Sequence, residues 1–140
     1  MTGSQTAGEL RVLVLEDEEG LRDLLTEMLQ TAGYAVIGCA SGPEALQRLA
    51  DVSPSVVISD VVMPEMDGLE FVSRLRAIPS SAHIPVLLIS GLAEGVSDTI
   101  DMCGAEQLGV SAVLPKPVEF TTLIEHVRRV TARIPAGKGE

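Results

Sequence analysis

The sequence predicts an α/β fold, a doubly wound parallel sheet of five strands that alternate with five helices. Short, continuous apolar runs are separated by amphipathic segments, and a strand buried on both faces of a sheet has no polar side. Crossovers between parallel strands are right-handed, so the helices should cover both faces of the sheet. A chain of 140 residues with 46% hydrophobic residues and a mean hydropathy of +0.31 can form one such domain with a buried core.

The strands are expected where apolar, largely β-branched runs occur. The first is centred on Val12-Leu13-Val14-Leu15, and the third and fourth contain Val56-Val57-Ile58 and Val86-Leu87-Leu88-Ile89. The predicted strands are 11–16, 34–39, 54–60, 84–90 and 110–114.

The helices are expected where apolar residues recur every three or four positions. Gly33 is a predicted stop for the first helix, and Ser41 and Asp67 are predicted N-caps for the second and third. The predicted helices are 18–32, the segment that starts at Ser41 and Pro43, the segment from Leu69 to Ile78, 93–108, and the segment that starts near Thr121 or Thr122 and contains Leu123 to Val130. We expect a domain of residues 10–133 between a disordered leader, 1–9, and a flexible tail, 134–140.

Composition excludes several classes of protein. A net charge of −10 disfavours direct nucleic-acid binding, which needs a basic face. No apolar run approaches the ~18 residues needed to cross a bilayer, and the first residues lack a signal-peptide pattern. Cys39 and Cys103 form no CxxC pair, and neither GxGxxG nor GxxxxGK[ST] occurs. We therefore expect a cytoplasmic protein that contacts neither membrane nor nucleic acid, and whose partners are proteins.

Polar residues end four of the predicted strands. They are Glu16-Asp17, Asp60, Ser90 and Lys116-Pro117. Because the carboxyl ends of parallel strands meet at one edge of a sheet, three carboxylates, a hydroxyl and an ammonium should gather there. The Lys116–Pro117 bond can be cis, which would aim the lysine inward.

This set of side chains suits a divalent cation and a phosphoryl group. Two carboxylates ~4 Å apart repel by roughly 4 kcal/mol at an effective dielectric near 20, so three need a cation or a proton. Oxygen ligands favour Mg²⁺, or Mn²⁺ in its place. Asp60 is then the candidate nucleophile, Glu16 and Asp17 hold the metal, and Lys116 neutralises charge. Singly, each residue has a simpler reading as a helix-terminal acid, a turn, a cap or a surface lysine, and their conjunction favours the site.

Four segments resemble the receiver domain of two-component response regulators. They are Val12 to Glu19 (VLVLEDEE), Asp60 to Gly68 (DVVMPEMDG), Ser90-Gly91 and Lys116-Pro117, within a match of about residues 9–132. The resemblance implies a flavodoxin-like fold with strand order 2-1-3-4-5. It also implies a phosphoryl-accepting signalling module that catalyses only its own phosphorylation and dephosphorylation. The implied partners are a sensor histidine kinase or a histidine phosphotransfer protein, which supplies phosphohistidine, and an unknown downstream protein.

The resemblance also implies a role for each residue of the site. Asp60 would be the phosphoacceptor, and Glu16, Asp17 and the Val62 carbonyl would hold Mg²⁺ together with it. Ser90 would be the switch hydroxyl and Lys116 the lysine that pairs with a phosphoryl oxygen. Val62 and Gly91 would offer backbone N–H groups to the other oxygens.

The chain departs from the receiver pattern in its second half. Val113 stands where receivers usually carry an aromatic residue, Val118 replaces a frequent Phe, and the stretch between Ser90 and Lys116 is longer by about one helical turn. Signalling through reordering of residues 91–108 is therefore our hypothesis. Two other functions stay open: a phosphate-independent interaction module, and a hydrolase with an aspartyl-phosphate intermediate, which would want an Asp at the position of Val62.

Overall fold

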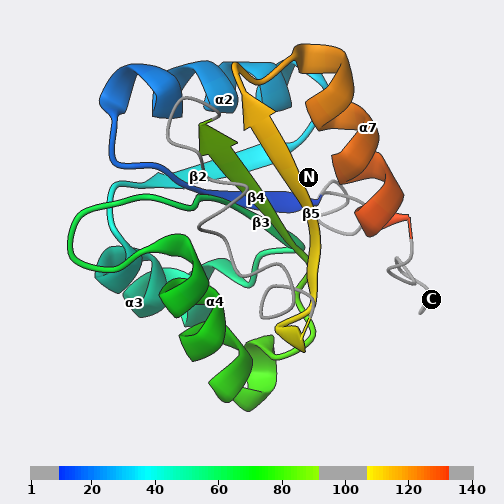
Figure 1. Cartoon of the computed structure of the whole chain (residues 1–140). Helices are drawn as coiled ribbons and strands as arrows, with labels where there is room; N and C mark the ends of the chain where they lie inside the picture. The colour runs from blue at the N-terminus through cyan, green and yellow to red at the C-terminus, as the bar shows by residue number, and fades with distance from the viewer. Residues whose placement is uncertain (1–9, 92–106, 133–140) are drawn as a thin grey trace.

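The computed structural model describes residues 10–91 and 107–132, and these residues form a five-stranded, all-parallel sheet. The strand order is β2-β1-β3-β4-β5 (Figure 1), which confirms the predicted doubly wound topology and the order 2-1-3-4-5. The strands are β1 (Arg11–Leu15), β2 (Ala35–Cys39), β3 (Val56–Asp60), β4 (Val86–Gly91) and β5 (Val110–Lys116).

The described residues contain four α-helices rather than the five expected. They are α2 (Glu19–Thr31), α3 (Gly42–Val52), α4 (Gly68–Ala77) and α7 (Phe120–Thr131), with a short 3-10 turn, η1 (Pro79–Ser81), after α4. The helix expected over 93–108 falls almost entirely in 92–106, outside the described residues, as do the expected leader 1–9 and tail 134–140. Among the described helices, none is both long and apolar enough to span a bilayer.

The helices cover the two faces of the sheet in pairs, as Figure 1 shows. Alternate residues of β1 illustrate the division, because Val12 and Val14 pack toward α2 and α7 whereas Leu13 and Leu15 pack toward α3 and α4. Each face therefore has its own apolar core. The core on the side of α3 and α4 includes Val57, Phe71, Val72, Leu75, Val86 and Leu88, and the core on the side of α2 and α7 includes Leu25, Leu29, Ile58, Leu87, Leu123 and Val127.

Local signals place the helix ends. Gly33 ends α2 with φ +101°, and the N–H groups of Gly33 and Tyr34 donate to the carbonyls of Gln30 and Leu29, the Schellman pattern. Ser41 and Asp67 cap α3 and α4 by accepting from the N–H groups three residues on, at 3.3 and 2.8 Å. All three predicted helix boundaries are confirmed.

Several predicted boundaries are wrong by one or two residues. Strands β3 and β4 begin at Val56 and Val86, two residues after their predicted starts at 54 and 84. Ile78 lies outside α4 with an extended conformation (φ −93°, ψ 115°), because the residue before a proline, here Pro79, avoids the helical region. Strand β5 continues past Leu114 to Lys116. Pro115 is tolerated there because β5 is an edge strand of the described sheet and one of its sides needs no ladder donor.

Arg76, in the last turn of α4, holds the amino edge of the sheet. Its guanidinium donates to the carbonyl oxygens of Ile84 at 2.6 Å, Ala82 and Gly109 at 3.2 Å, and Leu108. These carbonyls directly precede β4 and β5, so one side chain ties the entries of both strands to α4.

Candidate functional site

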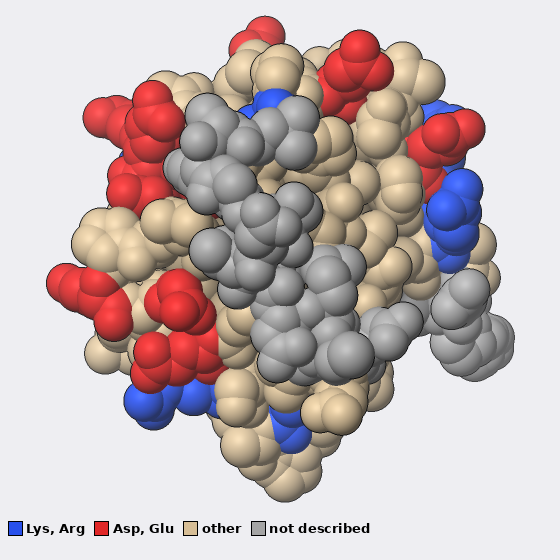
Figure 2. All heavy atoms as spheres, in the orientation of Figure 1, with Lys and Arg blue, Asp and Glu red and all other residues tan. Residues whose placement is uncertain are grey.

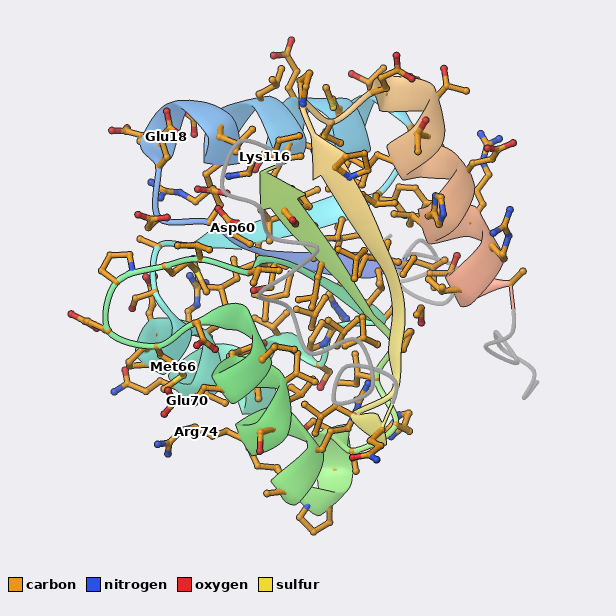
Figure 3. All side chains as sticks on the ribbon, in the orientation of Figure 1. Glu18, Asp60, Met66, Glu70, Arg74 and Lys116 are labelled. Carbon is orange, nitrogen blue, oxygen red and sulfur yellow. The ribbon has the colours of Figure 1, made fainter. Side chains whose placement is uncertain are left out.

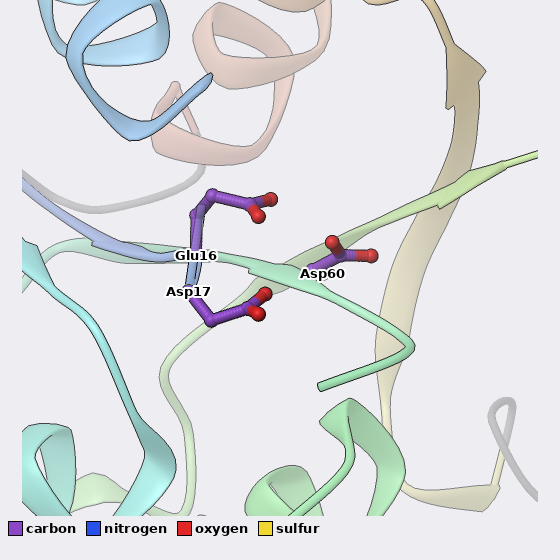
Figure 4. A group of neighbouring side chains, drawn as sticks. All are labelled: Glu16, Asp17 and Asp60. Atoms are coloured by element: carbon purple, nitrogen blue, oxygen red, sulfur yellow. The ribbon is translucent and has the colours of Figure 1, made fainter. Parts of the chain in front are cut away.

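Three carboxylates meet at the carboxyl edge of the sheet. Glu16 and Asp17 follow β1 and Asp60 ends β3, and because Leu15 pairs with Ser59 the two strand ends lie next to each other. One carboxylate oxygen from each of the three residues lies within 4.8 Å of the others (Figure 4). Glu16 and Asp60 are buried, at 1% and 4% exposure, whereas Asp17 is exposed.

Three hydrogen bonds hold Glu16, and one of its carboxylate oxygens remains without a hydrogen-bond partner. Its N–H donates to the Cys39 carbonyl at 3.1 Å, its carbonyl accepts from Arg22 Nη1 at 2.9 Å, and its Oε2 accepts from the Glu18 N–H at 3.0 Å. Among the described residues, Glu16 Oε1 is the buried side-chain polar atom that has no hydrogen-bond partner. Such an atom is costly unless a proton or a cation meets it.

The surroundings of Glu16 raise its pKa from an ordinary value of 4.5 to about 7. Burial is the largest cause, the Glu18 N–H opposes it, and the nearby Asp60 carboxylate raises the pKa further, because it favours a protonated Glu16 that could share its proton and repels an ionised one. Lys116 lowers it somewhat. Without a cation, Glu16 is therefore only partly ionised near neutral pH.

Lys116 and Asp60 form the ion pair of the site. Lys116 Nζ lies 2.8 Å from Asp60 Oδ2, and Figure 3 shows the two side chains together at the same edge of the sheet. The Lys116–Pro117 bond is cis, as the sequence allowed. The Val62 N–H points at Asp60 Oδ1 from 3.4 Å, a long and weak contact, while the Val62 side chain is 54% exposed.

The loop after Asp60 returns closely to the strand it leaves. The Gly68 N–H donates to the Val61 carbonyl at 2.8 Å, and a Cβ added to Gly68 would lie 2.4 Å from the Asp60 carbonyl oxygen. A side chain at this position would push the backbone of Asp60. Gly68 therefore allows the first turn of α4 to lie against the backbone of Asp60 and Val61.

Ser90 and Gly91 reach the same edge at the end of β4. Asp60 pairs with Ile89 across β3 and β4, so Ser90 is the next residue along, and Gly91 pairs with Lys116. Ser90 is buried, at 6% exposure. Contacts thus join Glu16, Asp17, Asp60 and Lys116, whereas strand register places Ser90 and Gly91 beside them.

The donor set fits a magnesium ion. Mg²⁺ is bound by hard oxygen ligands, usually one or two carboxylates with water and substrate oxygens completing the shell. Three converging carboxylates, one of them with an orphaned buried oxygen, supply those ligands and gain from a positive charge. The acidic cluster therefore suits a divalent cation.

The sequence alone indicates no role for Arg22 or Gly38. The Arg22 stem passes beside Gly38 of β2 on its way to the Glu16 carbonyl. The sequence shows that an arginine lies six residues after the acidic end of the first strand. It does not show which group this arginine bonds, because that depends on how α2 lies on the sheet.

Comparisons with known proteins agree with this geometry. The family description "Response regulator receiver domain" matches residues 12–128. A 14.6 kDa protein encoded in the sodA1 3′ region of Leptolyngbya boryana is 34% identical over 131 residues, covering 94% of this chain and 97% of that protein. Response regulator PleD of Caulobacter vibrioides is 38% identical over 121 residues, which are 86% of this chain but 26% of PleD.

Solved structures of receiver proteins also resemble the chain. The chemotaxis protein CheY4 of Vibrio cholerae superposes with a TM-score of 0.77 at 31% identity, covering 87% of this chain and 98% of CheY4. The receiver domain of a signal transduction histidine kinase from Syntrophus aciditrophicus gives a TM-score of 0.77 at 30% identity, over 89% and 91% of the two chains. The chain belongs to the receiver domain family of two-component response regulators.

Proposed function

We propose that Asp60 accepts a phosphoryl group and that the resulting acyl phosphate is the signal this chain carries. The observation that supports this most is the pairing of a nearly buried Asp60 with Lys116 at 2.8 Å inside a group of three carboxylates. The Lys116 ammonium beside the buried Asp60 can neutralise the negative charge of an arriving phosphoryl group. The Asp60 carboxylate can then act as a nucleophile.

The transfer step requires only groups of this chain and a phosphohistidine donor. An Asp60 carboxylate oxygen attacks the phosphorus, and the phosphorus–nitrogen bond of the donor breaks. The electron pair stays on the imidazole nitrogen, which then takes up a proton. Lys116, already held against Asp60 Oδ2, can follow the developing negative charge onto a phosphoryl oxygen.

Metal and backbone groups complete the site in this proposal. Glu16, Asp17, Asp60 and the Val62 carbonyl would hold Mg²⁺, or Mn²⁺, which when bound neutralises the charge that otherwise opposes attack by a carboxylate on phosphate. The N–H groups of Val62 and Gly91 would bind phosphoryl oxygens. The Ser90 hydroxyl, buried at the end of β4, would turn toward the phosphoryl group and report its presence.

The proposed partners are proteins. A sensor histidine kinase or a histidine phosphotransfer protein would supply the phosphoryl group, and an unknown downstream protein would read it in the cytoplasm. Acidic residues outnumber basic ones by 20 to 10, and Figure 2 shows them spread over several parts of the visible face, which favours a protein over a nucleic acid as partner. Val113 packs in the core beside α3 and α4, so readout would use groups other than an aromatic at this position.

Intact-mass spectrometry after incubation with acetyl phosphate and Mg²⁺ tests the proposal. We expect the mass of one added phosphoryl group, located on Asp60 by peptide mapping and lost when EDTA replaces Mg²⁺. In this reaction the phosphorus–oxygen bond of acetyl phosphate breaks and acetate leaves. A label on another residue would reject Asp60 as the acceptor.

The same experiment separates the two other functions. A hydrolase would release phosphate from monoesters in continuous turnover, whereas we propose that the chain catalyses only its own phosphorylation and dephosphorylation. A phosphate-independent interaction module would take no label and would show no Mg²⁺-dependent change on adding beryllofluoride. Either result would replace the proposed function.

A further inference from the structure

We infer that Arg22 is a positioning residue for the acidic pair that binds the metal, and that Gly38 provides the space it needs. This inference rests on the proposed function, because it concerns how the chain prepares its carboxylates for a cation. It concerns side chains on α2 and β2, outside the set that contacts the phosphoryl group.

Arg22 acts on the one peptide unit that joins the two metal-binding residues. Its Nη1 donates to the Glu16 carbonyl at 2.9 Å, and this carbonyl belongs to the peptide between Glu16 and Asp17. Glu16 is already fixed by its N–H bond to Cys39 and by the Glu18 N–H on its side chain. Asp17 is exposed, and the position of its Cα follows from the orientation of this peptide, which the bond from Arg22 restrains.

The path of the Arg22 side chain depends on a missing side chain in β2. A Cβ added to Gly38 would lie 3.3 Å from Arg22 Cδ and 3.4 Å from Arg22 Cγ. Contacts this close require the neighbour to move by a few tenths of an ångström. Gly38 pairs with Val14, two residues before Glu16, so the stem crosses β2 close to the end of β1.

The charge of Arg22 cannot explain a favourable role in cation binding. A guanidinium near three carboxylates repels an arriving Mg²⁺, so by Coulomb's law its removal should tighten metal binding. Restraint of the Glu16–Asp17 peptide predicts the opposite, because residues that orient metal ligands contribute about ten-fold or more to affinity. The sign of the change therefore distinguishes positioning from charge.

The test compares Arg22→Met, Arg22→Lys and the control Arg48→Met in Mn²⁺ titrations followed by the EPR signal of free Mn²⁺, with Mg²⁺ as competitor. Arg22→Met keeps most of the stem and removes the donor, and we expect about ten-fold weaker binding. Arg22→Lys keeps a donor and the charge and should retain most of the affinity. Arg48 is exposed and pairs with Glu44 at 4.0 Å, so Arg48→Met removes the same charge without loss of affinity.

A second readout uses the metal-free protein. In EDTA, the NMR amide signal of Asp17 should shift in Arg22→Met and stay in place in Arg48→Met. A purely structural role for Arg22 would lower the urea midpoint and leave the metal affinity unchanged. Binding by Arg22→Met that equals or exceeds wild type would overturn the inference.

Gly38→Ala keeps the test decisive if Arg22→Met does not fold. It leaves every polar group in place and displaces only the Arg22 stem, so a smaller loss of metal affinity supports the inference and an unchanged affinity overturns it. The wild type separates this inference from the proposed function. Absence of saturable Mn²⁺ or Mg²⁺ binding by the wild-type protein would reject the proposed metal site itself, whatever the variants do.

Discussion

The two edges of the sheet differ in how their charged side chains are paired. At the amino edge, the Arg76 guanidinium donates to four backbone carbonyls, which belong to Ala82, Ile84, Leu108 and Gly109. At the carboxyl edge, three carboxylates crowd together, and Glu16 Oε1 is buried without a hydrogen-bond partner. The fold supplies hydrogen-bond acceptors to the Arg76 guanidinium, whereas the carboxylate cluster leaves one buried oxygen without a partner.

This difference indicates a structural role for Arg76 and marks the carboxylate cluster as the candidate binding site. Buried polar groups in folded proteins are almost always satisfied, and the exceptions concentrate at sites that bind or react. Burial lowers the pKa of Arg76 and raises that of Glu16, so both groups bear the cost of leaving water. Hydrogen bonds offset that cost for Arg76, whereas a cation can offset it for the carboxylates.

The largest expected effect is the loss of phosphorylation in Asp60→Asn. The amide cannot form an acyl phosphate, so labelling by acetyl phosphate should disappear, as judged by intact mass. The fold should persist with a change in unfolding free energy of about 1 kcal/mol or less, because an oxygen remains for Lys116 and one repelling charge is removed. Asp23→Asn, on the exposed face of α2, is the matched control and should label normally. Labelling of Asp60→Asn at the wild-type rate would move the acceptor elsewhere.

Arg76→Met should destabilise the fold without changing the site. Hydrogen bonds from charged donors contribute about 1.5 to 3 kcal/mol each, and two of the four bonds of Arg76 are solvent-exposed, so we expect a loss of about 3 kcal/mol in urea unfolding. Arg74→Met is the control, since Arg74 lies on the outside of α4 in a 3.0 Å pair with Glu70 (Figure 3) and should change stability by about 0.5 kcal/mol or less. Equal effects of the two substitutions would remove the structural role assigned to the amino edge.

Local sequence signals predicted most of the fold. The five strands and the helix ends at Gly33, Ser41 and Asp67 follow from apolar runs and capping chemistry that act over a few residues, whereas the strand order followed from the resemblance to receiver domains. Ile78 was misplaced because its apolar spacing continues the helix while the following proline ends it. Competing local signals of this kind are resolved by backbone sterics, which an apolar pattern does not contain.

Strand topology predicted which residues gather at the site, but not how they are held. The meeting of Glu16, Asp17, Asp60 and Lys116 follows from parallel strands ending at one edge. The Arg22 bond to the Glu16 carbonyl depends on the path of one long side chain over β2. The orphaned Oε1 depends on which of two chemically equal oxygens meets the Glu18 N–H. Such details arise only after packing.

The smallest expected effect concerns the proton held by Glu16 in the absence of metal. Its pKa is raised to about 7 in the folded protein from an ordinary value of 4.5, so between these pH values the folded state binds more protons than the unfolded state. The unfolding free energy should therefore fall as the pH rises through this window, by at most about 3 kcal/mol, and Glu16 should add no further change above it. Urea unfolding in EDTA at pH 5 and pH 8 measures this fall.

Glu16→Gln should remove that part of the pH dependence, because the amide does not ionise, and should leave the metal-free protein more stable than wild type at pH 8. Glu27→Gln, an exposed carboxylate on α2, should keep the wild-type slope. Saturating Mg²⁺ should also abolish the Glu16 contribution in wild type, since a metal-bound carboxylate carries no proton, and should leave the slope of Glu16→Gln unchanged. A slope unchanged in Glu16→Gln would show that Glu16 does not carry this proton and would contradict the prediction.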